Sequence, residues 1–186
     1  HSLQVSPIEI PHDVNIYVQF VAHRQLASSA YSDRVAQCAQ AEQHIGPLRL
    51  AEVGNVHNIA DDVLRRRALH VVSENDRVRR ATVALALQDL TTFGQLMNES
   101  HQSLRDNFEV STNQMDEAVR NAQQTPGVFG ARMTGGGFGG CTINLVKKGQ
   151  EQQIKDKFSK LYTEAFGIEL KIYDVKVSNG TSLYTK

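Results

Sequence analysis

The 186-residue chain carries 20 basic and 20 acidic side chains, so its formal net charge is zero. A length of this order is enough for one sizeable hydrophobic core or one elaborated domain. The balanced charge argues against a nucleic-acid or anionic-membrane partner recruited by bulk charge, and no apolar run approaches the length of a membrane span.

The first predicted element is a strand at residues 14–22, where side chains alternate in character along the chain. Such alternation is typical of a half-buried strand. One face would hold Val14, Ile16, Val18, Phe20 and Ala22, and the other Asn15, Tyr17, Gln19 and Val21.

Small and polar residues follow at 23–33 and predict a loop that runs into a helix opening at residues 31–34. Tyr31 stands at this opening. A tyrosine in such a place is usually a half-buried packing wedge, but its hydroxyl can also bond a sugar. The residues alone favour packing over binding.

A long helix is predicted from Asp61, with a stripe at helical spacing formed by Leu64, Ala68, Val71, Asn75, Val78, Thr82 and Leu85. Asn75 lies in the middle of the stripe, so it either bonds the backbone of a neighbouring segment or acts as a buried brace behind a site. The arginines at 65–67 and at 77–80 are interpreted as a solvated helix flank, since acidic residues balance them and no aromatic residues interleave.

Three further helices are predicted, at about residues 91–103, from Ser111 to the Pro126-Gly127 break, and at about 150–166. Ser111 is the expected N-cap of the second, with Gln114 completing a capping box. The buried stripe of that helix would be Met115, Ala118, Val119 and Ala122. The last helix would bury Ile154, Phe158, Leu161, Tyr162 and Ala165.

The densest signal is the run from Gly135 to Gly140, in which five of six residues are glycine, between apolar stretches at 128–133 and 141–146. The pattern predicts strand, glycine loop, strand. A dinucleotide fingerprint is rejected because a strand rather than a helix follows, and a P-loop is rejected because Gly140-Cys141-Thr142 lacks the lysine. Exposed N–H groups could line a phosphate or a neighbouring domain. A close-packed hairpin without a ligand explains the pattern equally well.

A final strand near residues 172–177 would place Tyr173, Val175 and Val177 on one face. Four strands and about five helices then follow the order of a split βαβ unit. The predicted fold class is α+β, a ferredoxin-like, four-stranded and mainly antiparallel sheet with additional helices, in a single domain over residues 1–186.

The residues from Gly130 to Cys141 resemble the third signature motif of the galactokinases, which are members of the GHMP family of small-molecule kinases. Two other stretches support the resemblance. Residues 29–34 resemble the Ser-x-Tyr-x-x-Arg motif of that family, and residues 100–111 resemble its Ser-His-x-Ser-Leu-Arg-Asp segment. A weaker match is the His…Glu-Asn-x-Arg-Val pattern at 70–78, to which we assign structure rather than catalysis.

The resemblance implies the C-terminal domain of a GHMP kinase. Galactokinases transfer the γ-phosphate of MgATP to the anomeric hydroxyl of galactose. The resemblance also implies that Tyr31 contacts the sugar and that the glycine motif lines the cleft. The motif residues are Thr134, Gly135, Gly136, Gly137, Phe138, Gly139 and Gly140. The catalytic aspartate, the magnesium ligands and the phosphate loop of the family are N-terminal, so this chain would hold no catalytic residue and no metal ligand.

The implied partners are galactose, ATP and the protein's own N-terminal domain, which would bind most of the MgATP. Because the chain begins with His1, we expect it to begin inside a longer protein. Because it supplies neither the metal ligands nor the phosphate loop of the family, we expect it to be inactive alone. Two widely separated cysteines suit free thiols in a reducing cytosol.

Two alternatives stay open, a non-catalytic galactokinase-like sugar sensor and a stand-alone ferredoxin-like interaction module. N-acetylgalactosamine is an alternative sugar.

Overall fold

The computed structural model describes residues 7–23 and 28–176. Its centre is a four-stranded sheet of β1 (Val14–Ala22), β2 (Val128–Thr134), β3 (Gly140–Lys147) and β4 (Lys171–Val175). The strand order is β2-β3-β1-β4, and every neighbouring pair is antiparallel. This confirms the predicted ferredoxin-like arrangement.

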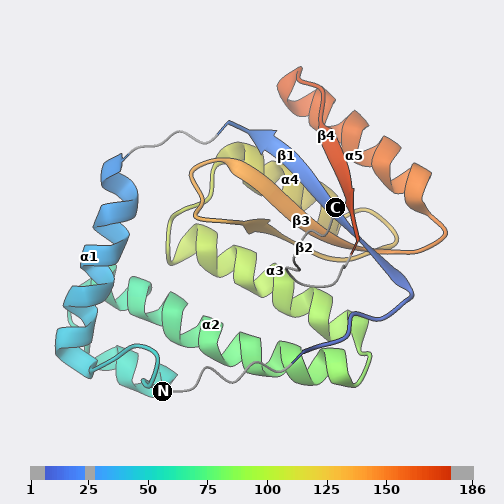
Figure 1. The fold of residues 1–186 in the computed structure, drawn as a ribbon. Coiled ribbons are helices and arrows are strands. Elements are labelled where there is room, and N and C mark those ends of the chain that lie inside the picture. The colour runs from blue at the N-terminus through green and yellow to red at the C-terminus, as the bar shows by residue number, and fades with distance from the viewer. Residues whose placement is uncertain (1–6, 24–27, 177–186) are drawn as a thin grey trace, which may run out of the picture.

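Different helices cover different parts of the sheet (Figure 1). α4 (Asn113–Gln123) and α5 (Glu151–Phe166) cover one face and share its main core. α3 (Leu90–Asp106) lies along β2, and α2 (Asp62–Ala86) packs on α3. α1 (Ser28–Ile45) and the 3₁₀ turn η1 (Val53–Asn58) pack on α2 at the end of the molecule farthest from β4.

The free edge of β2 is closed by α3, which prevents that edge from pairing with another strand. The N–H of Ala131 donates to Asn98 Oδ1 at 2.8 Å, and the N–H of Met133 donates to His101 Nδ1 at 3.2 Å. Close approach is possible because Gly94 of α3 meets Gly130 of β2: an ideal Cβ on Gly130 would lie 2.1 Å from the Gly94 carbonyl oxygen.

The more deeply buried face of β1 is the one that holds Tyr17, Gln19 and Val21. Two side-chain hydrogen bonds form on this side of the sheet: the Thr142 hydroxyl donates to Gln19 Oε1 at 3.2 Å, and the Asn144 amide donates to the Tyr17 backbone carbonyl at 3.2 Å. Gln19 Nε2 is buried without a hydrogen-bond partner among the described residues. On β4 only Ile172 packs against the core, and the side chains of Tyr173 and Val175 are exposed. Val177 lies outside the described residues.

Several helix predictions need correction. α1 begins at Ser28, three residues before the expected opening. Thr112 rather than Ser111 caps α4, because the Ser111 hydroxyl donates to the Asp116 carboxylate at 2.5 Å instead. Ala165 of α5 is exposed. Of the predicted stripe on α2 only Ala68 is fully buried, while Val78 and Thr82 are exposed.

Other helix predictions are confirmed. Asp61 caps α2, and the four residues of the α4 stripe are all buried. Asn75 donates to the Leu48 carbonyl at 3.2 Å, which is the bond to a neighbouring backbone that was one of its two expected roles. Across the residues that the structure describes, no helix combines the length and apolar character needed to cross a membrane.

Candidate functional site

The loop between β2 and β3 uses backbone conformations that favour glycine. Gly135, Gly137, Gly139 and Gly140 have φ of 82°, 82°, 108° and 105°, and Phe138 has φ of 59°. L side chains rarely adopt this region, so the glycine density reflects a backbone requirement.

The loop divides into an exposed half and an anchored half. Thr134, Gly135 and Gly136 are exposed, whereas Gly137 and Gly139 are buried and Phe138 packs against the main core. The N–H of Phe138 donates to the Val110 carbonyl at 2.8 Å, and an ideal Cβ on Gly137 would lie 2.3 Å from that oxygen. Close packing therefore explains the second half only, and the first half is free to face a ligand or another domain.

Tyr31 lies in the first turns of α1 and is 57% exposed. The expectation of a half-buried packing wedge is therefore wrong. An exposed phenol hydroxyl is available to donate to, or accept from, a hydroxyl-rich ligand.

A single short segment, residues 107–110 between α3 and α4, connects the start of α1 to the glycine loop. Arg34, one turn after Tyr31, donates through Nε to the Phe108 carbonyl at 2.5 Å and through a terminal nitrogen to the Glu109 carbonyl at 3.0 Å. The next residue, Val110, receives the hydrogen bond from Phe138. The structure thus joins two sequence regions that both resembled galactokinase motifs.

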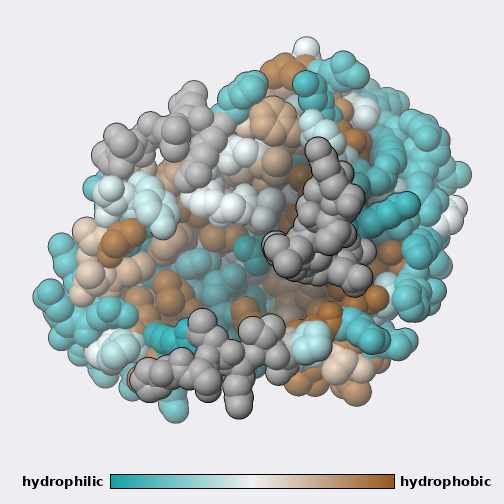
Figure 2. Space-filling view, in the orientation of Figure 1, coloured by the Kyte–Doolittle hydropathy of each residue, from teal (hydrophilic) through white to brown (hydrophobic). Residues whose placement is uncertain are grey.

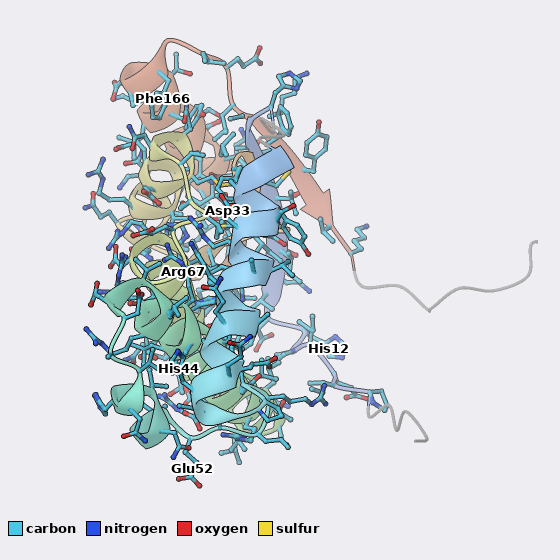
Figure 3. All side chains as sticks on the ribbon, turned by 90° about the vertical axis from the view of Figure 1, so that its left-hand side faces the viewer. His12, Asp33, His44, Glu52, Arg67 and Phe166 are labelled. Carbon is cyan, nitrogen blue, oxygen red and sulfur yellow. The ribbon has the colours of Figure 1, made fainter. Side chains whose placement is uncertain are left out.

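Sequence reasoning missed the role of Arg67, which it placed on a solvated flank. The side chain is only 2% exposed, and it lies beside α1 in the view of Figure 3. Its Nε donates to Gln37 at 2.8 Å, and its terminal nitrogens reach the Asn107 carbonyl and the Glu109 carboxylate. The partners on residues 107–110 are about forty positions away in sequence, so no local pattern could have indicated them.

A hollow of about 520 Å³ opens next to Thr134, between the sheet, α2 and α3. Figure 2 shows this face hollowed, with hydrophobic and hydrophilic side chains together on its wall. Its polar end holds Glu74, Arg77, Ser100 and Arg132. Burial favours the neutral form of Glu74, but hydrogen bonds from Arg77 and Ser100 outweigh it and hold the Glu74 pKa below its ordinary value.

The polar groups near His101 do not form a catalytic triad. His101 Nδ1 accepts from Met133, so Nε2 carries the proton and lies 3.2 Å from Asp116, poorly aligned for a hydrogen bond. Asp106 instead pairs with Arg105 at 2.7 Å, as expected for a carboxylate partner of Arg105. The contacts of His101 with Met133 and Asp116 join α3 to β2 and to α4.

His70 should make stability depend on pH. Its ring is buried, stacks on Phe108 and lies 3.0 Å from the Ser103 hydroxyl, and burial lowers its pKa from 6.5 to about 4. The unfolded chain therefore takes up this proton first as pH falls. The free energy of unfolding should decrease between about pH 6.5 and 4, by up to about 3 kcal/mol.

Denaturant unfolding across pH 4–7 measures this effect, and His70→Gln should flatten the decrease. His44→Gln, which removes an exposed histidine of α1, is the matched control. An unchanged pH profile for His70→Gln would contradict the assignment.

Comparison with known proteins identifies relatives along most of the chain. Residues 81–164 match the family model described as GHMP kinases C terminal. A galactokinase from Lactiplantibacillus plantarum is 37% identical over 185 residues, which is 94% of this chain and 48% of the relative. A galactokinase from Staphylococcus saprophyticus is 41% identical over 167 residues, which is 84% of this chain and 43% of the relative.

Solved structures agree. Lactococcus lactis galactokinase complexed with galactose matches with a TM-score of 0.88 and 33% identity, over 95% of this chain and 48% of that one. L. major mevalonate kinase in complex with R-mevalonate has a TM-score of 0.59 and 22% identity over 91% of this chain and 44% of that one, a likeness of fold alone. The chain spans about half the length of the curated relatives it matches.

Proposed function

Since this chain belongs to the GHMP kinase family, whose C-terminal domain it carries, we propose that it is the C-terminal part of a galactokinase. The whole enzyme transfers the γ-phosphate of ATP to the anomeric hydroxyl of galactose. The observation that carries the proposal is the likeness to a galactose-bound galactokinase over 95% of the chain.

Residues 1–186 form one domain in this proposal, and a domain outside the chain supplies the rest of the site. Phosphoryl transfer depends on positioning and on charge stabilisation around the transferred group. Within the described ranges no group of three acidic, histidine or cysteine side chains could hold a metal ion. ATP binds mainly to the other domain, and the isolated 186-residue chain has no kinase activity above background.

The chain contributes a sugar contact and a cleft surface. The Tyr31 hydroxyl bonds galactose, and Thr134, Gly135 and Gly136 form the exposed rim that the sugar and the triphosphate approach. Gly137, Phe138, Gly139 and Gly140 hold that rim against the core through Val110. Free thiols at Cys38 and Cys141 suit a reducing cytosol, where we place the enzyme.

Tyr31→Phe tests the sugar contact, because it removes one oxygen atom and leaves the ring. In the full-length enzyme the galactose KM should rise about tenfold, which corresponds to about 1.4 kcal/mol. The ATP KM and the melting temperature should stay unchanged. Tyr173→Phe is the matched control, since Tyr173 is similarly exposed but lies on β4. An unaltered galactose KM in Tyr31→Phe would remove Tyr31 from the sugar site.

A further inference from the structure

The 107–110 segment is held by charged groups from two helices at once. Arg34 of α1 donates to the carbonyls of Phe108 and Glu109, and Arg67 of α2 donates to the carbonyl of Asn107. These carbonyls belong to the end of α3 and the residues after it. Cationic partners are favourable there, because the last carbonyls of a helix lack intrahelical donors.

The arginines near Glu109 are not an open anion site. Each nitrogen of Arg67 has a partner, among Gln37, Asn107 and Glu109. Arg34 is committed in the same way, since its third nitrogen lies 3.3 Å from the Gln37 oxygen. Their geometry therefore suits holding protein groups in place rather than binding a phosphate.

Glu109 is the centre of this arrangement, because its backbone and its carboxylate are both constrained. Its φ of 54° is uncommon for a residue with a side chain and costs of the order of 1 kcal/mol. The carboxylate pairs with Arg66 and Arg67. The chain then turns so that the Val110 N–H donates to the Leu104 carbonyl and the Val110 carbonyl faces the glycine loop.

We propose that Glu109, together with Arg34 and Arg67, is a positioning element that fixes the placement of Tyr31 relative to the glycine loop. This inference rests on the proposed function, in which Tyr31 contacts the sugar and the loop lines the cleft. Glu109 acts through the 107–110 segment and does not touch the substrate. Displacements near 1 Å in a positioned site cost large factors in rate, so a loosened connection should be measurable in sugar binding.

Glu109→Gln in the full-length protein is the principal test, because it removes the charge with little change in size. The galactose KM should rise at least fivefold, while the ATP KM stays within twofold. In a Tyr31→Phe background the same change should have a smaller effect, since the two residues act on one contact. Arg34→Lys, which keeps the charge but loses the fork that spans two carbonyls, should show an intermediate increase.

Asp76→Asn is the matched control, because Asp76 also lies near two arginines, Arg79 and Arg80, but contacts neither the 107–110 segment nor the loop. If the Glu109→Gln protein has the same KM values for galactose and ATP as the Asp76→Asn protein, the proposal is overturned. Fully additive effects with Tyr31→Phe, or a lower melting temperature with both KM values unchanged, would also overturn it.

Hydrogen exchange gives a second readout that does not depend on activity. The Phe138 amide, which donates to Val110, should exchange at least tenfold faster in Glu109→Gln than in Asp76→Asn. Unchanged exchange would overturn the connection between Glu109 and the loop. If the wild-type protein phosphorylates no sugar, the proposed function fails, and the exchange result still decides whether Glu109 holds the loop.

Discussion

Gly94→Ala should destabilise the protein by about 3 kcal/mol, although the same change in an ordinary helix interior gains about 1 kcal/mol. An ideal Cβ at position 94 would lie 2.1 Å from the Phe129 carbonyl oxygen and 2.9 Å from the Phe129 Cβ. The obstructing oxygen and carbonyl carbon are backbone atoms, so α3 would have to move away from β2. That movement would also stretch the hydrogen bonds from Ala131 and Met133 to α3.

The melting temperature measures this effect, and a decrease of about 6 to 12 °C is expected for a chain of this length. Gly54→Ala is the matched control, since an added Cβ there meets nothing within 4 Å. A Gly94→Ala protein that is as stable as the wild type, or more stable, would show that α3 does not depend on this contact.

Gly137→Val should lower kcat/KM of the full-length enzyme about a hundredfold. Valine at this position combines an unfavourable φ of 82° with a Cβ only 2.3 Å from the Val110 carbonyl oxygen. The hydrogen bond from Phe138 to that oxygen would be lost, and the exposed rim at Thr134, Gly135 and Gly136 would shift with it. A hundredfold loss corresponds to about 2.7 kcal/mol of transition-state stabilisation.

Gly135→Ala distinguishes the effect of backbone strain at positive φ from the effect of a steric clash of the added Cβ. Gly135 has the same φ, but an added Cβ meets nothing within 4 Å, so the loss should be clearly smaller than for Gly137→Val. Steady-state kinetics on both variants makes the comparison. If Gly137→Val keeps full kcat and KM, the motif is a structural hairpin and the cleft assignment fails.

Local patterns predicted the elements well, because alternation, helical spacing and breaks such as Pro126-Gly127 depend on neighbours in sequence. They could not decide which sheet face is buried more deeply. On β1 the main core receives Tyr17 and Val21, because α4 and α5 cover that face, whereas Ile16 stays partly buried against a second cluster with Met97 and Leu145. Similarly, Ser111 has the residue type of an N-cap, but Asp116 attracts its hydroxyl.

The candidate site was predictable only where a residue type carries its own chemistry or where a motif resembles a known family. The glycine run was found by its composition, whereas Tyr31 was assigned to the sugar only by its resemblance to a galactokinase motif. The structure leaves Tyr31 and the first half of the loop exposed. Arg67 was placed on the wrong surface, since three consecutive arginines resemble a solvated flank. Its buried position depends on Glu109 and Asn107, which only the tertiary fold brings near it.

The most direct measurement assays the full-length protein and the isolated 186-residue chain side by side with galactose and MgATP, with the sugar product identified by NMR. We expect galactose 1-phosphate from the full-length protein at about 1–100 turnovers per second, as is typical of kinases, and none above background from the isolated chain. A full-length protein that binds galactose without phosphorylating it would contradict the account and indicate a sugar sensor. Turnover by the isolated chain would equally contradict the division of the active site between two domains.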